Sequence, residues 1–412
     1  MEPFLTPEPP IPEPLRGEET GSFAHFTVTQ RFPAIVRQVL DENQFPAEIV
    51  ARLEALIDDI PAAQLRQLQD TTAPDAAAWI AYLSPYEGQN WLQVPWFFAE
   101  TYFYRRILEA TGYFLPGDWQ GFDPYEGQKR NGLKASLPAI QEFAERLQEA
   151  QNTDIPSRQE TLSSLLISAV WGNQADLSMW FSGDEDAPPT LQAQEQKKHL
   201  LIDDTQAIVS HLLNEGGDLE RVDVLADNTG LELFHDLCLV DYLLAGLSVR
   251  TVFFHLKFHP TFVSDAMPKD VLAALAFLSA RPETEIASLA RRMQDHLDSG
   301  RLRLHNDLFW TSPLPAWEIP ALLRQQLAQS NLILSKGDAN YRRLIGDRHW
   351  GFSHPIASIL RYRPAPLAAL RVFKSEVAAG LAPGLPNRME SRDPEWLIDG
   401  HWGEIQFAGP LD

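Results

Sequence analysis

Asp227 and Asn228 stand between an apolar run, VDVLA, and an apolar helical pattern, LELFHDL. A carboxylate and an amide at the end of a buried strand offer two hard oxygen ligands, which suit a divalent cation such as Mg²⁺ or Mn²⁺. In an open α/β sheet, ligands bind outside the carboxyl ends of the strands. Helix capping is the alternative interpretation, since Asp and Asn are both favoured N-caps. The two roles are compatible, because one residue can cap while its neighbour binds.

A second carboxylate, Asp265, follows the next apolar run, RTVFFHLKF. If the two runs are neighbouring strands, Asp265 joins Asp227 and Asn228 at one sheet edge and makes a three-ligand site that water completes. Glu232, one turn into the following helix, could hold a metal-bound water or a substrate hydroxyl. A favourable interaction with the helix dipole explains Glu232 equally well.

Basic residues gather in two segments of a chain whose formal net charge is -22. The segment NLILSKGDANYRRLIGDRHW carries Lys336, Arg342 and Arg348, and ALRVFKSEV places Lys374 in an apolar strand pattern. Phosphate recognition is one explanation for this concentration of charge. A solvated basic face is the other, and we prefer it for Arg343. Lys374 could equally form a structural ion pair, because a desolvated charge needs a partner.

The segment WGNQADLSMW places Asn173 and Asp176 at the end of an apolar helix. A capping turn is the simplest interpretation, and a contribution to the same site is the alternative. The sequence contains no HExxH, GxSxG or GxGxxG motif and no Walker A loop. An aspartyl-phosphate mechanism of the haloacid dehalogenase type would need a second Asp two residues after Asp227, where Thr229 stands.

The composition narrows the class of function. With 412 residues, 44% of them hydrophobic, the chain can bury a substantial core. Its negative charge would repel phosphate backbones, which argues against nucleic-acid binding. A signal peptide and a membrane span are not expected, so a cytoplasmic protein without a membrane partner is the default. The single cysteine, Cys238, excludes an intrachain disulfide and is expected to pack inertly.

The elements that position these residues fall into three predicted regions. Residues 1–20 are proline-rich and predict a flexible arm. Residues 21–155 show apolar spacings of three and four, which predict a helical subdomain. Residues 156–412 alternate strand and helix patterns, which favours an α/β/α domain with a mainly parallel sheet covered on both faces.

Five segments are expected to be strands: RVDVLADN, RTVFFHLKF, RLRLHNDLF, NLILSK and ALRVFKSEV. The segment AQEQKKHLLIDDTQAIVSHLLNE is expected to be mostly helical. The segment WLIDGHWGEIQF predicts a small hairpin with Asp399-Gly400 as its turn.

Several of these segments, in this order, resemble the DUF89 family of metal-dependent damage-control phosphatases, in particular its acidic residue methyltransferase 1-like subgroup. The matching segments are WGNQADLS, ADNTGLELFHDL, FVSD, KGDANYRRLIGD and RVFK, with WFFAETYFYRRI nearer the amino terminus. The resemblance runs from roughly residue 20 to 410. It implies a helical amino-terminal subdomain packed on a Rossmann-like α/β/α domain.

The resemblance also implies roles for particular residues. Asp227, Asn228 and Asp265 would form the catalytic centre and hold a divalent metal, Mn²⁺ or Mg²⁺, with Co²⁺ and Ni²⁺ as alternatives. The implied substrate contacts come from Glu232, Asp338, Asn340, Arg342 and Lys374. The subgroup's Arg-Thr-x-Lys signature appears as Arg371-Val372-Phe373-Lys374, so the lysine is retained and any hydrogen bond from the threonine is lost.

The implied activity is metal-dependent hydrolysis of phosphate monoesters, such as fructose 1-phosphate and related sugar phosphates. One alternative is an S-adenosylmethionine-dependent protein carboxyl O-methyltransferase, an activity also attributed to this subgroup. Against it, LADNTG offers only Gly230 where a Rossmann methyltransferase has a glycine-rich turn. A non-catalytic sugar-phosphate-binding protein is the second alternative. The sequence leaves the physiological substrate, the native metal, the nucleophile and the oligomeric state open.

Overall fold

A computed structural model of the chain describes residues 6–153, 158–172, 196–214 and 219–410. Its centre is a seven-stranded sheet with the order β1-β7-β6-β5-β2-β3-β4. Strands β2 to β6 run parallel, β7 is antiparallel to β6, and β1 pairs in parallel with β7. The strands are β1 (Leu200–Asp203), β2 (Arg221–Leu225), β3 (Thr251–Lys257), β4 (Leu302–Asp307), β5 (Leu332–Lys336), β6 (Leu367–Val372) and β7 (Gly403–Ala408).

Both faces of the sheet are buried because helices pack on each of them, and successive strand residues point to opposite faces. In β2, Val222 and Val224 belong to one apolar core, whereas Leu225 belongs to the other. The first core includes side chains of α8 (Arg158–Trp171), α11 (Thr205–Asn214), α12 (Leu231–Asp241), α13 (Pro268–Ser279) and α14 (Thr284–Asp298). The second includes side chains of α15 (Ala321–Leu327) and α16 (Asp338–Ile345). The result is the predicted α/β/α domain with a mainly parallel sheet.

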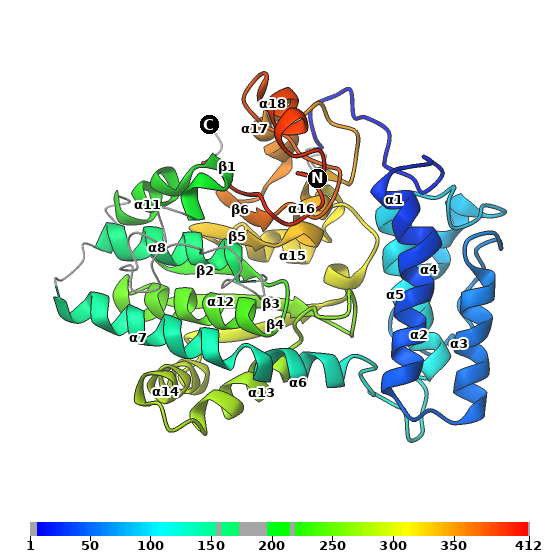
Figure 1. Cartoon of the computed structure of the whole chain (residues 1–412), viewed down its shortest axis with the longest axis horizontal. Helices are drawn as coiled ribbons and strands as arrows, with labels where there is room; N and C mark the ends of the chain where they lie inside the picture. Colours follow the sequence, from blue (N-terminus) through cyan, green and yellow to red (C-terminus); the bar gives the residue numbers. More distant parts are fainter. Residues whose placement is uncertain (1–5, 154–157, 173–195, 215–218, 411–412) are drawn as a thin grey trace.

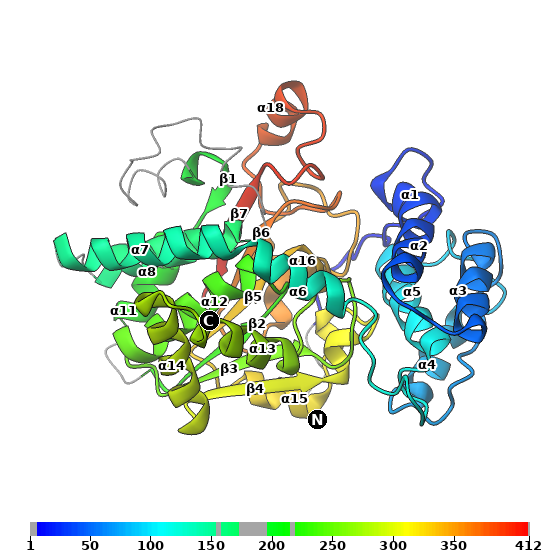
Figure 2. The ribbon, with the colours of Figure 1, turned by 60° about the horizontal axis from the view of Figure 1, so that its bottom comes forward.

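A separate group of helices lies beside one end of the sheet in both ribbon views (Figure 1, Figure 2). Its central member is α5, in which every residue is buried. The members are α1 (Phe23–Phe26), the π-helix η1 (Thr27–Arg31), α2 (Phe32–Glu42), α3 (Ala47–Asp59), α4 (Ala76–Leu83) and α5 (Trp96–Thr111). We refer to residues 23–111 as the helical subdomain. Across the described ranges, no helix has both the length and the apolar character needed to cross a membrane.

Shorter helices complete the structure. They are η2 (Ser84–Tyr86), η3 (Tyr242–Gly246), η4 (Leu308–Thr311), η5 (Ala316–Glu318), α17 (Ile356–Ile359), η6 (Leu360–Tyr362) and α18 (Leu385–Arg392).

The five predicted strands are confirmed as β2 to β6. The segment expected to be mostly helical does form α11, but it also contains an unpredicted strand, β1, since LLID pairs with β7 at the sheet edge. The carboxyl-terminal segment does not form a hairpin. Instead, its second half, β7, pairs antiparallel with β6. Both differences arise from pairing between segments far apart in the chain, which local pattern does not report.

Two segments pack differently from the predicted regions. Helix α7 (Leu137–Thr153), which follows α6 (Glu126–Ala135), lies over α12 and α14 of the sheet domain, although we expected it in the helical subdomain (Figure 1). Residues 6–20, expected to be flexible, are packed. Leu15 is buried, its amide donates to the carbonyl of Asp347 at 2.9 Å, and its carbonyl accepts from the amide of Trp96 at 2.7 Å.

Candidate metal and phosphate site

The candidate site lies where the carboxyl ends of adjacent parallel strands meet. Asp227 and Asn228 follow β2, Gly337 and Asp338 follow β5, and Lys374 follows β6. The chain passes from β2 through β3 and β4 on one side and returns to β5 on the other side of β2. Because the connections after the neighbouring strands β2 and β5 leave in opposite directions, a crevice opens at the carboxyl ends of these strands. Ligands of open α/β sheets bind at such switch points.

The loop after β3 folds back and brings Asp265 beside β2. The amide of Ala266 donates to the carbonyl of Asp227 at 2.8 Å, and Asn228 and Asp265 form an isolated antiparallel bridge. Oδ2 of Asp265 lies 2.9 Å from Nζ of Lys257, the last residue of β3. Burial raises the pKa of Asp265, and Lys257 opposes the shift. The neighbouring strands thus bring together the residues that we expected to converge.

Asp227 fits the role of a metal ligand. It is buried, and its Oδ2 accepts a hydrogen bond from Nδ2 of Asn228 at 2.7 Å, whereas its Oδ1 accepts none from the residues that the structure describes. Burial, and then the carboxylates of Glu232 and Asp265, hold the pKa of Asp227 well above its ordinary value. A divalent cation would relieve this repulsion, and two carboxylates with an amide oxygen form a donor set that suits a hard ion.

The amide of Asn228 is fixed by three side chains. Its Nδ2 donates to Asp227 and also to Oε2 of Glu232, at 3.0 Å. Its Oδ1 accepts from the hydroxyl of Ser264 at 2.5 Å and retains a second lone pair. The network orients the amide oxygen independently of any ligand, so Asn228 can contribute an oxygen to a metal without reorganisation.

These residues line a cavity of about 210 Å³ between the carboxyl ends of the strands and the helical subdomain. From the sheet domain its walls include Asp227, Asn228, Glu232, Phe262, Asp265, Asp338, Arg342, Val372 and Lys374. From the helical subdomain they include Phe23, Arg31, Trp96 and Glu100. A cleft between two parts of a chain, with convergent polar groups and a perturbed carboxylate, is a common form of active site.

Lys336, which we expected to bind phosphate, is instead occupied by two carboxylates. It is fully buried, and its Nζ lies 3.1 Å from Oε1 of Glu232 and 3.0 Å from Oδ1 of Asp236. Burial alone would lower the pKa of Lys336, but Asp236 and Glu232 outweigh it and raise that pKa. Burial raises the pKa of Asp236 to about 7, and Lys336 opposes this shift. Lys336 is therefore a structural cation that orients Glu232.

Arg342 reaches the cavity wall but is held there by two carboxylates. Its Nη1 lies 2.6 Å from Oε2 of Glu100 and its Nε lies 2.8 Å from Oδ1 of Asp347. The guanidinium stacks 3.6 Å from the ring centroid of Trp96. Burial alone would lower the pKa of Arg342, but Asp347 and Glu100 raise it. The residue joins the helical subdomain to α16, and its contact with a substrate phosphate stays a prediction.

Asn340 was expected to contact the substrate and Arg343 to lie on a solvated face, and the structure places both elsewhere. Asn340 does not line this cavity. Its Nδ2 donates instead to the carbonyls of Ala226 at 3.0 Å and Lys336 at 2.8 Å. It ties β2 to β5, so a sugar contact does not fit its position. Arg343 is buried instead of lying on a solvated face, and it donates to the carbonyl of Trp310 at 3.1 Å.

Arg348 and Cys238 are both placed by the structure. Arg348 donates to the carbonyl of Pro12 and does not line the cavity. Cys238 is buried, and burial raises the pKa of its thiol, as inert packing requires. Asn173 and Asp176 lie outside the described residues.

Asp338 and Lys374 both line the cavity. Oδ1 of Asp338 accepts hydrogen bonds from Nη1 of Arg371 at 2.7 Å and from the Ser375 hydroxyl at 2.9 Å. Lys374 is half-buried, and within the described part of the chain no carboxylate lies at ion-pair distance from its Nζ. Val372, at the position of the signature threonine, lines the same wall. Lys374 is therefore available to an anion, whereas Arg371 is not.

Among the described residues, two further acidic clusters have spacings that could hold a metal ion. In the first, Asp123, Glu126 and Asp270 surround two lysines. Nζ of Lys129 lies 3.0 Å from Asp123 and 2.9 Å from Asp270, and Nζ of Lys269 lies 3.0 Å from Asp123. These lysines already neutralise the cluster.

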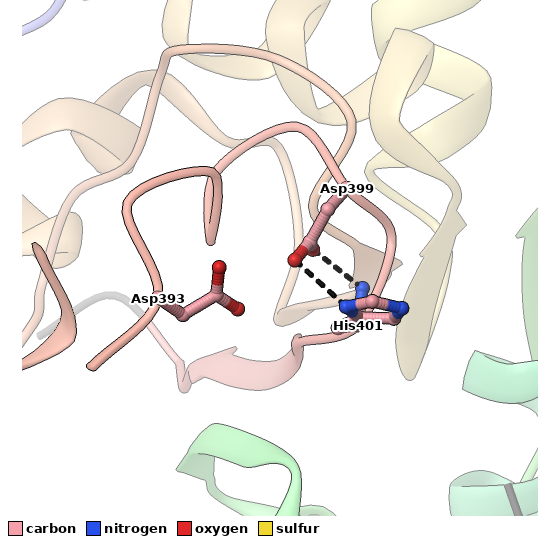
Figure 3. A group of neighbouring side chains, drawn as sticks. All are labelled: Asp393, Asp399 and His401. Atoms are coloured by element: carbon pink, nitrogen blue, oxygen red, sulfur yellow. Dashed lines mark hydrogen bonds and ion pairs between the residues drawn. The ribbon is translucent and has the colours of Figure 1, made fainter.

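The second cluster joins Asp393, Asp399 and His401, whose side chains face one another (Figure 3). Oδ2 of Asp399 lies 2.8 Å from Nδ1 of His401. Oδ2 of Asp393 accepts from the indole of Trp402 at 2.7 Å. These two carboxylates thus contact an imidazole and an indole, whereas Asp227 accepts only from the amide of Asn228 and, among the described residues, its Oδ1 has no hydrogen-bond partner.

Sequence reasoning missed the contribution of the helical subdomain and of Lys257. Glu100 stands alone as an acid in the aromatic run WFFAETYFYRR, which is a signal for a buried ion pair. Lys257 ends an apolar strand, and the argument applied to Lys374 would have found it. Arg31 and Ser264 carried no comparable signal.

Comparison with known proteins places the chain in a family. The family model described as damage-control phosphatase ARMT1-like domain matches residues 27–388. Relatives named damage-control phosphatase ARMT1 are 32% identical in Bos taurus, over 97% of this chain and 99% of that one, and 30% identical in Homo sapiens, over the same shares. A solved DUF89 family protein from Pyrococcus horikoshii is similar at 14% identity and a TM-score of 0.45, covering 84% of this chain and 90% of that one. The chain therefore belongs to the damage-control phosphatase ARMT1-like family, whose members are metal-dependent phosphatases.

Proposed function

We propose that this protein hydrolyses sugar phosphates, such as fructose 1-phosphate or related damaged phosphometabolites, at the cavity beside Asp227. One observation carries the proposal: a metal-type donor set and a lysine without a carboxylate partner in the described chain line the same cavity. The names of the relatives, damage-control phosphatases, support the reaction class. The choice of a sugar phosphate rests on the resemblance and on the polar groups of the cavity.

Asp227, Asn228 and Asp265 would hold the divalent ion. When bound, Mg²⁺ or Mn²⁺ supplies Lewis-acid neutralisation of the phosphoryl charge. Lys374 would bind the remaining phosphate oxygens as a point charge, which positions the ester and stabilises charge that develops during hydrolysis. Lys257 keeps Asp265 in place, and the residues around Asn228 keep its amide oriented, so the site is preorganised.

Polar groups near the phosphate position are suited to the sugar. Asp338 is held by Arg371 and Ser375 and lines the cavity, so it can accept hydrogen bonds from hydroxyl groups. Glu232 lines the same cavity and is oriented by Lys336. Val372 supplies an apolar surface in place of a threonine hydroxyl.

A phosphate-release assay over a panel of sugar phosphates tests the proposal, with Mg²⁺, Mn²⁺, Co²⁺ and Ni²⁺ supplied in turn. We expect release that depends on the metal and stops with a chelator. Lys374→Gln should lower kcat/KM by about tenfold or more, because a hydrogen bond to a charged group is lost. Release without metal, or no release with any metal, would contradict the proposal.

The same preparations separate the two alternative functions. Tight binding of S-adenosylmethionine that needs no metal, measured by calorimetry, would favour the methyltransferase. Binding of sugar phosphates without any turnover would favour a non-catalytic protein. Phosphate release that rises with the fraction of protein that has bound metal would argue against both alternatives.

A further inference from the structure

Arg31 is a cavity residue that the proposed chemistry leaves without a role. It is the last residue of η1 and comes from the helical subdomain, not from the strand ends that carry the metal ligands. It is exposed, and in the part of the chain that the structure describes no carboxylate lies at ion-pair distance from its guanidinium. π-helical turns like η1 occur frequently at functional sites.

The other two arginines of the cavity wall are both paired. Arg342 lies between Glu100 and Asp347, and Arg371 lies 2.7 Å from Asp338 and 2.8 Å from Glu404. The chain has 56 acidic and 34 basic residues, so carboxylates are plentiful. Arg31, which lines a cavity and forms no ion pair with a described carboxylate, is therefore available to an anionic ligand.

The position of Arg31 is tied to the position of Lys374. The backbone amide of Phe23, at the start of the same continuous helix, donates to Oε2 of Glu376 at 2.8 Å. Glu376 lies two residues after Lys374 in the loop that follows β6. The ring of Phe23 also packs edge-on against Trp96, with centroids 5.9 Å apart. These contacts fix the wall that carries Arg31 relative to the wall that carries Lys374.

The surroundings of Arg31 differ from those of Lys374. The helical wall of the cavity is largely aromatic, with Phe23 and Trp96, and Phe262 adds a third ring from the sheet domain. Glu100, the acid on that wall, is committed to Arg342. An ion held at Asp227 would, together with Lys374, be enough to bind one phosphate dianion. Arg31 is therefore available to bind a different group of the ligand. The aromatic side chains of the wall can contact the carbon skeleton between that group and the phosphate.

We infer that Arg31 binds a second anionic group of the substrate, a phosphate or a carboxylate remote from the phosphate that is hydrolysed. This inference rests on the proposed function and narrows its substrate class to sugar phosphates with two acidic groups. The planar guanidinium matches either anion in a bidentate geometry. Arg31 thereby acts as a specificity-determining residue supplied by the helical subdomain.

Two matched substrate pairs test the inference. Fructose 1,6-bisphosphate differs from fructose 1-phosphate by a second phosphate, and 6-phosphogluconate differs from sorbitol 6-phosphate by a carboxylate. The wild-type protein should show a higher kcat/KM for the doubly acidic member of at least one pair. Arg31→Gln should lower kcat/KM for that member about tenfold or more, mainly through KM, and change the singly acidic member less than about twofold. Arg31→Lys should fall between.

Arg37→Gln is the matched control, because Arg37 is an exposed arginine of α2 that does not line the cavity. Its kinetics should equal those of the wild type. The pair that responds identifies the second anion as phosphate or carboxylate, and either response supports the inference. An equal loss for both members of each pair, or no loss in Arg31→Gln, would overturn the inference alone. A wild-type protein that hydrolyses none of the four compounds would overturn the proposed function and the inference with it.

Discussion

Gly337 approaches Asp227 so closely that a Cβ atom at position 337 would lie 1.9 Å from Oδ2 of Asp227. Gly337 also has φ 82° and ψ 167°, a conformation that is essentially restricted to glycine. The glycine therefore does two things at the end of β5. It lets the chain turn into α16, and it leaves room for the carboxylate on the neighbouring strand end.

Gly337→Ala should damage both the fold and the site. The added methyl group must displace Asp227, and the backbone must adopt a strained conformation, so we expect a loss of about 1–3 kcal/mol in the free energy of unfolding. Phosphate release should fall at least about a hundredfold, since the proposed metal ligand Asp227 moves. Urea unfolding and the release assay measure the two effects. Gly132→Ala, at an open position within α6, is the control and should stabilise by up to about 1 kcal/mol. Equal behaviour of the two variants would contradict the role given to Gly337.

Glu100→Gln should be strongly destabilising. It removes one of the two carboxylates that hold the buried guanidinium of Arg342, and taking one partner out of a buried ion-pair network costs about 3 kcal/mol or more. Glu48→Gln is the matched control, because Glu48 pairs with Arg52 at 3.2 Å on the surface. That change should alter stability by less than about 1 kcal/mol. Urea unfolding of the three proteins checks the prediction, and similar small losses in both variants would show that Arg342 does not depend on Glu100.

His259 should make the fold sensitive to acid. It is buried in the loop after β3, with Nε2 4.0 Å from Oδ2 of Asp75 in the helical subdomain. Burial lowers the pKa of His259 to about 4, and Asp75 opposes the shift. The unfolded chain, with a histidine pKa of about 6.5, therefore binds more protons than the folded chain between these values. This contribution to stability is complete above about pH 6.5 and is lost as the pH falls towards 4.

His259→Gln should therefore weaken the dependence of stability on pH. Between pH 7 and pH 5 the wild type should lose about 2 kcal/mol that the variant does not lose. Urea unfolding at the two pH values gives the comparison. His349→Gln removes an exposed histidine and serves as the control. The same loss in wild type and His259→Gln would exclude His259 as the source.

The strand ends were predictable because their signals are local. An apolar run that stops at Asp227-Asn228, and another that stops at Lys336-Gly337, indicate the carboxyl edge of a buried sheet directly. The meeting of Asp227 with Asp265 followed from the assumption that β2 and β3 are neighbours, which is confirmed. These inferences needed only the period of the pattern and the rule for parallel sheets.

The partners of the charged residues were not predictable in the same way. Arg342 and Glu100 are 242 positions apart, and nothing local indicates that one neutralises the other. The partners of Lys336 lie on α12, more than 90 positions earlier, so its charge suggested a phosphate until the structure showed Glu232 and Asp236. Local composition reports that a charge is present, whereas the fold decides which charges remain available to a ligand.

Asp227→Asn, followed by titration calorimetry with Mn²⁺, tests the central claim most directly. The side chain keeps its shape and loses the carboxylate, so the metal-free variant should unfold at the same or a higher urea concentration than the wild type. Asp399→Asn, in the other acidic cluster, is the control. The account predicts that Asp227→Asn binds Mn²⁺ at least about a hundredfold more weakly than wild type and releases no phosphate, while Asp399→Asn behaves as wild type. Wild-type Mn²⁺ affinity in Asp227→Asn, or loss of binding only in Asp399→Asn, would contradict it.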